Sequence, residues 1–288
     1  MENFKKTTNA GTAVPAPSSK GKLYVVGIGP GAVEHMSQRA IEVIRQCECV
    51  VGYTTYVGLI SELVADKEVF STGMTQEVDR CEKAISLAAE GRSVAVVSSG
   101  DPGIYAMAGL ILELLGGRQG IDVEIVPGVP ALCASAARLG APLMHDFACI
   151  SLSDRLTSWE LIEKRLHAAS DADFVIVLYN PKSKGRSTHI NTARDIILRY
   201  RAETTPVGIV KGAMRSDEAV VITDLSRMLN YEIDMHTTVI VGNSQTLRIN
   251  DFLVTPRGYE EKKKKEKKGG GSAPPSTPPA RGPVPLTP

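Results

Sequence analysis

Short apolar runs alternate along the chain with longer stretches in which apolar residues recur every three or four positions. In the first half, the short runs predict strands at Leu23–Gly27, Cys49–Val51, Glu68–Ser71, Ser93–Ser98 and Val123–Val126. The stretches between and after them predict helices at Met36–Arg45, Glu77–Glu90, Ile104–Leu115 and Pro130–Leu139. This βα alternation predicts a mostly parallel sheet that is covered by helices on both faces.

The pattern restarts after the turn at Gly140-Ala-Pro142. The second half predicts strands at Ala148–Leu152, Phe174–Leu178, Val207–Lys211, Ala219–Thr223 and Thr237–Gly242, with helices at Trp159–Ala168 and Thr188–Tyr200. We therefore expect an α/β protein of two lobes, residues 22–140 and 141–258. No fixed-period repeat is visible, which argues against solenoids and propellers.

The two ends of the chain differ in composition from this body. Seven of the 17 prolines lie between Pro274 and Pro288, after a run of Glu, Lys and Gly that starts at Glu260. Such segments bury too little apolar surface to offset the entropy lost on ordering, so residues 259–288 are predicted to be disordered. We make the same prediction for residues 1–21. A polybasic tail that binds a partner is the alternative for the C-terminal segment.

Charge and cysteine content exclude several classes of protein. The formal charge is +1, but residues 259–288 contribute +4 and residues 1–21 contribute +2, which leaves −5 for the body. An acidic body without a basic face argues against a nucleic-acid-binding protein. No apolar run is long enough to span a membrane, and no signal peptide is visible. The five cysteines form no CxxC pair, which fits core residues of a protein in a reducing cytosol.

Proline marks the loops that follow the predicted strands. Five of the eight prolines in the body lie in such loops, and they are Pro30, Pro102, Pro127, Pro130 and Pro181. In open α/β sheets, ligands bind beyond the carboxyl ends of the strands. The first loop, GIGPG at 27–31, is not a dinucleotide fingerprint, because its spacing is GxGxG and Pro30 lacks an N–H for a pyrophosphate. The chain also contains no P-loop motif.

The most informative loop is SSGDPGIY at 98–105, which combines small residues with a single acid, Asp101. Small residues permit close approach of a ligand to the backbone, and a negative charge is favoured at the start of the helix predicted to follow. A simple helix N-cap is the alternative role for Asp101. The loops VPGVPA at 126–131 and LYNPKS at 178–183 repeat the same small, rigid style.

These loops, together with VGNSQT at 241–246, resemble the tetrapyrrole (corrin and porphyrin) methylases. The resemblance covers residues 22–258. It implies two α/β lobes with the active site in the cleft between them, S-adenosylmethionine as methyl donor, and a homodimer. GMTQEVDRC at 73–81 and APLMHDFACISLSD at 141–154 resemble the branch that methylates carbon 17 of precorrin-3B or cobalt-factor III and promotes ring contraction in cobalamin synthesis.

The resemblance also implies which residues contact the cofactor. They are Pro30, Gly100, Asp101, Ile104, Pro130, Ala131, Asn180, Gly212 and Ala213. Pro130 departs from the threonine that is common in the family, so it can contribute only backbone or packing contacts. A sulfonium is already a strong methyl donor, so the protein must mainly align the reactants and exclude water. We therefore expect no metal site, and the five histidines show no metal-ligand spacing.

Ring contraction needs proton transfer, and a polyanionic macrocycle needs cations to hold it. His35 and His145 are the candidates for proton transfer, although each could be an ordinary surface or packing histidine. Arg155, Lys182, Lys184 and Arg186 are the candidates for pairing with substrate carboxylates, although they could form a solvated loop. Since the body is acidic, positive charge must gather locally if this hypothesis is right. Methylation at another ring carbon, or binding of a tetrapyrrole without catalysis, remains an alternative function.

Overall fold

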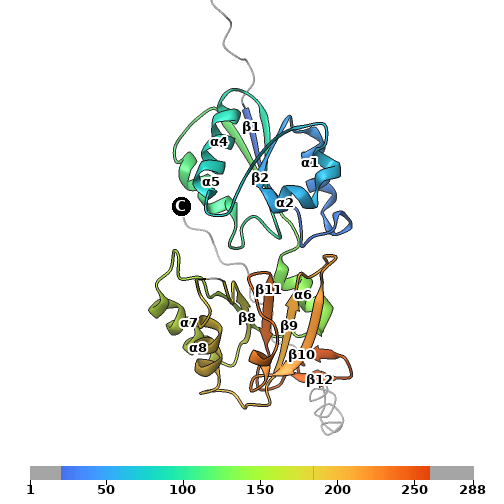
Figure 1. Ribbon diagram of the computed structural model, residues 1–288, viewed down its shortest axis with the longest axis vertical. Coiled ribbons are helices and arrows are strands. Elements are labelled where there is room, and N and C mark those ends of the chain that lie inside the picture. Colours follow the sequence, from blue (N-terminus) through green and yellow to red (C-terminus); the bar gives the residue numbers. More distant parts are fainter. Residues whose placement is uncertain (1–20, 184, 260–288) are drawn as a thin grey trace, which may run out of the picture. The chain divides into compact units, whose positions relative to one another are not determined.

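The computed structural model describes residues 21–183 and 185–259 (Figure 1). The predictions of disorder therefore fall, except at Gly21 and Tyr259, outside the described residues, as does the candidate Lys184. Among the described helices, none is long and apolar enough to cross a membrane.

The first sheet is built from five parallel strands in the order β3-β2-β4-β1-β5. The strands are β1 (Gly21–Gly27), β2 (Cys49–Tyr53), β3 (Glu68–Thr72), β4 (Ser93–Ser98) and β5 (Ile121–Val126). Because every strand runs in the same direction, all five carboxyl ends lie along one edge of the sheet. The prediction of a parallel sheet in this half of the chain is confirmed.

Helices cover both faces of this sheet (Figure 1). Successive residues of a strand point to opposite faces, so Leu23 and Val25 pack with α4 and α5, whereas Tyr24 and Val26 pack with α1 and α3. The helices of this lobe are α1 (Gln38–Gln46), α2 (Thr54–Leu59), α3 (Ser61–Val64), α4 (Glu77–Ala89) and α5 (Met107–Leu115), preceded by a 3-10 turn, η1 (Val33–His35).

Two helix starts differ from the prediction by more than one residue. Helix α1 begins at Gln38, because Ser37 serves as N-cap and accepts a hydrogen bond from the Ala40 N–H. Helix α5 begins at Met107 and not at Ile104, so the loop after β4 is longer than predicted. The short helices α2 and α3 were not predicted, since a segment rich in Thr, Tyr and Val has no clear helical period.

The second sheet has the order β10-β9-β11-β8-β7 and is mixed. Only β7 (Phe147–Ser151) and β8 (Val175–Tyr179) pair in parallel. The remaining strands are β9 (Pro206–Lys211), β10 (Ala219–Asp224) and β11 (Thr237–Val241). The pairs β10–β9, β9–β11 and β11–β8 are all antiparallel. The βα alternation fails here because β9 and β10 are joined by residues 212–218 without a crossover helix, and such a connection reverses the chain.

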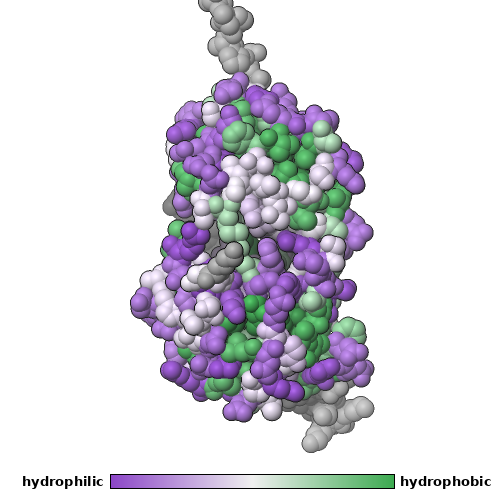
Figure 2. Space-filling model, in the orientation of Figure 1, coloured by the Kyte–Doolittle hydropathy of each residue, from purple (hydrophilic) through white to green (hydrophobic). Residues whose placement is uncertain are grey.

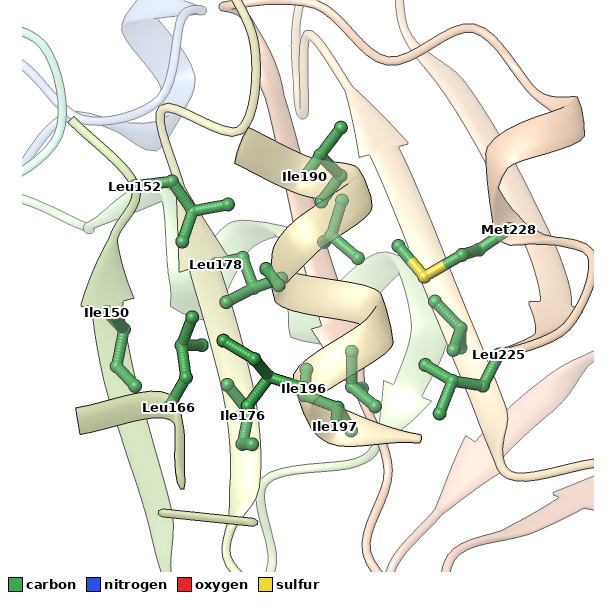
Figure 3. Packing of buried hydrophobic residues seen from close by; sticks show 14 of the residues in the cluster. Ile150, Leu152, Leu166, Ile176, Leu178, Ile190, Ile196, Ile197, Leu225 and Met228 are labelled. Carbon is green, nitrogen blue, oxygen red and sulfur yellow. The ribbon is translucent and has the colours of Figure 1, made fainter. Parts of the chain in front are cut away.

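Each face of the second sheet also has its own cover. One face packs against α7 (Trp159–Asp171) and α8 (His189–Ile197), where Leu166, Ile176 and Leu178 are fully buried (Figure 3). The opposite face packs against α6 (Ala131–Leu139) and against the small sheet of β6 (Gly140–Ala141), β12 (Leu247–Ile249) and β13 (Phe252–Val254). The 3-10 turn η2 (Met228–Asn230) adds Met228 to the first of these cores.

Helix α6 belongs by its packing to the second lobe. Its residues Leu132 and Leu139 share a core with Val177 and Val210 of the second sheet. The change from one core to the other therefore comes between β5 and α6, ahead of the predicted boundary at 140/141.

Outside these cores, the face drawn in Figure 2 is largely hydrophilic over both lobes, with apolar patches between the polar side chains.

Candidate active site

Three glycine-containing loops meet at the carboxyl edge of the first sheet. Gly29 and Gly100 form an isolated bridge in which each N–H donates to the other's carbonyl, at 3.2 and 2.7 Å. A Cβ placed on Gly128 would lie 2.2 Å from the carbonyl oxygen of Gly100, and one on Gly27 would lie 2.6 Å from it. The backbones of the loops after β1, β4 and β5 are thus too close for any side chain between them.

Asp101 fastens two of these loops together. Its Oδ1 accepts a hydrogen bond from the N–H of Gly103 at 2.8 Å, and its Oδ2 accepts one from the N–H of Gly128 at 3.1 Å. The N-cap of α5 is Ala106, so the alternative that Asp101 caps this helix is wrong. Asp101 instead holds the loop after β5 against the loop after β4.

The second lobe contributes three segments at an edge of its own sheet. Asn180 (φ 51°) follows β8, and Gly212 (φ 55°) follows β9. Strand β11 runs antiparallel and pairs Thr237 with Lys211, so its beginning lies beside the end of β9. This pairing brings residues 235–238 to the same edge. Asparagine is one of the few residues besides glycine that adopts a positive φ readily, so Asn180 permits the sharp turn of the chain after β8.

A cavity of about 360 Å³ lies among these loops of both lobes, within the range of small-molecule sites. All nine residues that were predicted to contact the cofactor line it: Pro30, Gly100, Asp101, Ile104, Pro130, Ala131, Asn180, Gly212 and Ala213. Two of the four predicted substrate residues, Arg155 and Arg186, line it as well.

Hydrogen bonds between the lobes hold the cavity walls in place. Arg215 donates from Nε to the carbonyl of Pro30 at 2.8 Å and from Nη2 to Oγ of Ser99 at 3.0 Å. The hydroxyl of Tyr105 donates to the carbonyl of Cys149 at 2.9 Å. Both Arg215 and Tyr105 line the cavity, so each side chain is a wall of the site and a contact between the lobes.

The lining also presents neutral polar groups. Burial raises the pKa of Tyr179, and the pKa values of the Tyr56 and Tyr105 phenols are raised by the same cause. These phenols therefore stay protonated at neutral pH. Within the described part of the chain, the buried hydroxyl of Ser98 has no hydrogen-bond partner, and Ser98 lines the cavity. An unpaired buried hydroxyl fits a ligand that supplies the missing partner.

The cavity is basic although the body of the chain is acidic. Four arginines line it, Arg80, Arg155, Arg186 and Arg215, against two acids, Glu77 and Asp101. The local positive charge that a polyanionic substrate requires is thus present. The two predicted lysines do not supply it, since Lys182 is exposed and is not a lining residue, and Lys184 lies outside the described residues.

The two histidines predicted for proton transfer do not line the cavity. His35 lies at the end of η1 with its Nε2 3.5 Å from a carboxylate oxygen of Glu34, and Nδ1 of His145 accepts a hydrogen bond from the N–H of Asp146. All five histidines of the chain fall in the described ranges, and among them His236 alone is a lining residue. Sequence reasoning missed it because it looked for sites only at strand ends, whereas His236 immediately precedes a strand.

The chain matches the family model of the Tetrapyrrole (Corrin/Porphyrin) Methylases over residues 22–229. The chain belongs to the tetrapyrrole methylases. It is 52% identical over 246 residues to a relative from Priestia megaterium named cobalt-factor III methyltransferase, covering 84% of this chain and 46% of that protein. The methylase thus spans about half the length of that relative.

Two further comparisons extend this assignment. The methylase is 50% identical over 239 residues to a protein from Salmonella typhimurium named probable cobalt-factor III C(17)-methyltransferase, covering 82% of this chain and 99% of that one. Its fold matches the crystal structure of the methyltransferase CobJ with a TM-score of 0.78 at 35% identity, covering 82% of this chain and all of that one. The two-lobed α/β fold expected from the sequence is confirmed.

Proposed function

We propose that the chain transfers a methyl group from S-adenosylmethionine to carbon 17 of cobalt-factor III or precorrin-3B and promotes contraction of the ring. One observation carries the proposal: the nine residues expected at the cofactor come from separate loops of both lobes, and all line one cavity. The names of the relatives from Priestia megaterium and Salmonella typhimurium support cobalt-factor III as the acceptor.

The residues of the cavity fit S-adenosylmethionine. This cofactor supplies a methyl group on a positively charged sulfur, and the transfer needs no protein nucleophile. Gly100 and Gly212 give the backbone freedom for close contact, both having positive φ, while Ser98 offers an unpaired hydroxyl. Asp101 holds its loop by two backbone hydrogen bonds and so keeps Gly100 and Ile104 in position.

The chain's own work in the reaction is to align and to enclose. Arg155 and Arg186 bring positive charge to the cavity, where they can pair with acetate and propionate groups of the acceptor. Arg186 is already fixed by donation from Nη1 to the carbonyl of Leu152 at 3.1 Å, which limits the freedom lost on binding. Tyr105 and Arg215, which line the cavity and join the lobes, fix the walls against which the reactants are aligned.

Ring contraction requires proton exchange with the macrocycle, and His236 is the imidazole that the cavity presents for it. A role for His35 or His145 would need these side chains to reach a substrate from outside the lining. The proposal also includes a homodimer, which the resemblance implies, and a reducing cytosol, which the five free cysteines support.

The test is methyl transfer by the purified chain. The protein is incubated with S-adenosylmethionine labelled in its methyl group and with either cobalt-factor III or metal-free precorrin-3B, and the products are analysed by mass spectrometry. We expect label in a ring-contracted product from at least one acceptor, and the productive acceptor identifies whether cobalt is required. Binding of both acceptors without label in either product would refute the proposal and favour a non-catalytic binding protein.

A further inference from the structure

The segment GMTQEVDRC at 73–81 forms a second wall of the cavity. None of the nine expected cofactor residues lies in this segment. Met74, Glu77 and Arg80 of this segment all line the cavity. Arg80 lies on α4 and is only 4% exposed, which makes it the one buried arginine of the lining. A buried guanidinium is costly unless it is held by hydrogen bonds and neutralised by an anion.

The contacts of Arg80 fix its position but leave part of the guanidinium free. Nη1 donates to Oγ1 of Thr72 at 2.8 Å and to the carbonyl of Gly73 at 2.7 Å. Nη2 lies 3.5 Å from Oε1 of Glu77. Within the described part of the chain, Nε and Nη2 make no hydrogen bond. An arginine has five N–H donors, so three of those of Arg80, a lining residue, make no hydrogen bond within the described residues, and Nη2 has only the longer ion-pair contact with Glu77.

Glu77 does not fully neutralise this cation. Its Oε1 also accepts a hydrogen bond from the N–H of Thr75 at 3.2 Å, and its side chain is 46% exposed. The aromatic ring of Tyr53, another lining residue, lies 6.0 Å from the guanidinium carbon. Arg80 is therefore held as a fixed, incompletely paired cation between an aromatic ring and the loop of residues 72–76.

The order of strands separates this cation from the cofactor loops. Arg80 is anchored at the end of β3 and next to the end of β2, whereas Gly29, Asp101 and Gly128 belong to the loops after β1, β4 and β5. In the order β3-β2-β4-β1-β5, strand β3 is two spacings from β4, roughly 10 Å, and three spacings from β1, roughly 14 Å. The cavity thus has two ends along one sheet edge.

From this arrangement we infer that Arg80 binds a carboxylate of the tetrapyrrole periphery, through its free Nε and Nη2 donors. The inference rests on the proposed function and adds a substrate subsite to it. A guanidinium held in a fixed orientation favours the planar geometry of a carboxylate. The amino-acid carboxylate of the methyl donor, S-adenosylmethionine, has the same chemistry. The expected contacts of this cofactor, however, lie toward the other end of the carboxyl edge of the sheet. The experiment below separates these two sources.

The test measures two affinities in Arg80→Gln and Arg80→Lys. Cobalt-factor III is titrated by its absorbance in the presence of S-adenosylhomocysteine, and S-adenosylhomocysteine alone is titrated by calorimetry. We expect Arg80→Gln to weaken cobalt-factor III binding by at least ~10-fold. Arg80→Lys should weaken it less, because lysine keeps the positive charge and loses only the two parallel N–H donors of the guanidinium. The affinity for S-adenosylhomocysteine should stay within about two-fold of the wild-type value; a two-fold change corresponds to about 0.4 kcal/mol.

Thr72→Val is the matched control, because it removes one structural partner of Arg80 and keeps the cation. We expect it to weaken cobalt-factor III binding less than Arg80→Gln does, because the Gly73 carbonyl still holds Nη1, and to leave the affinity for S-adenosylhomocysteine unchanged. A second probe is cobalt-factor III with its carboxylates esterified, for which wild type and Arg80→Gln should have equal affinity. Should Arg80→Gln fail to fold, the comparison of Arg80→Lys with Thr72→Val decides the question by the same measurements.

Three results would overturn the assignment. The first is unchanged binding of cobalt-factor III by folded Arg80→Gln, or by Arg80→Lys where the glutamine variant does not fold. The second is an equal loss in Thr72→Val, which would make Arg80 a purely structural residue. The third is an equal loss of S-adenosylhomocysteine affinity in Arg80→Gln, which would mean that Arg80 binds the carboxylate of the methyl donor. Absence of methyl transfer by the wild type would instead refute the proposed function itself.

Discussion

Replacement of Asp101 by alanine tests whether the cofactor site depends on the contact between two loops. The carboxylate of Asp101 accepts hydrogen bonds from the N–H groups of Gly103 and Gly128, at 2.8 and 3.1 Å. Hydrogen bonds to a charged group contribute about 1.5–3 kcal/mol each, and Asp101 is only half-buried, so the lower end applies. Loss of both should free the loops by about 3 kcal/mol, of which water bonded to the two N–H groups restores a part.

We expect Asp101→Ala to raise the Kd for S-adenosylhomocysteine by roughly 10- to 100-fold, because the cofactor must then order the loops itself. Isothermal titration calorimetry measures this change, and circular dichroism confirms that the variant is folded. Asp101→Asn keeps one carbonyl oxygen as acceptor, so its Kd for S-adenosylhomocysteine should lie between those of the wild type and Asp101→Ala.

Asp122→Ala is the matched control for this experiment. Asp122 lies on the edge strand of the same sheet, its side chain is 62% exposed, and its carboxylate lies 3.8 Å from Nζ of Lys22. A surface ion pair of this kind contributes about 0–1 kcal/mol, so cofactor affinity should not change. An Asp101→Ala protein that binds S-adenosylhomocysteine like the control would refute the reasoning, because the loop contact would then have no role in the site.

Two further predictions concern the contact between the lobes and the cysteines. Arg215→Met removes two hydrogen bonds that join the lobes, so it should lower the free energy of unfolding by roughly 1–3 kcal/mol and Tm by several degrees. Arg248→Met removes an exposed ion pair and should leave Tm nearly unchanged, and equal melting of the two variants would contradict the prediction. Cys133 should react with a disulfide reagent before the other thiols near pH 8, because it is exposed, although partial burial raises its pKa too. Burial raises the pKa of Cys47 and Cys81 to about 12 and slows them, and a fastest phase that persists in Cys133→Ser would disprove the assignment.

The sequence was most informative where local rules determine the outcome. Apolar runs located the strands of the first sheet to within about two residues, most directly for β1, β2 and β4, which are buried and therefore have nearly continuous apolar sequences. The loops at 27–31, 98–105 and 126–131 were placed at one sheet edge for a general reason, since parallel strands bring their carboxyl ends together.

Sequence reasoning failed where long-range pairing decides the outcome. The reversal of β11 places His236 at the cavity, and no local pattern distinguishes a parallel from an antiparallel strand. Arg215 reaches Pro30 across 185 positions of the chain, so its role in the site left no mark in nearby residues. The motif VGNSQT at 241–246 follows the far end of β11, where Ser244 bonds Asp173, and it does not line the cavity.

The early passage of the chain into the second lobe has a mechanical consequence. Residues 127–130 form the one covalent connection between the two cores within the described part of the chain, and the last of them, Pro130, lines the ligand cavity. Two prolines stiffen this connection, and Asp101 fastens its glycine. A ligand in contact with Pro130 therefore touches the connection between the two lobes, so the angle between the lobes and the shape of the pocket depend on each other.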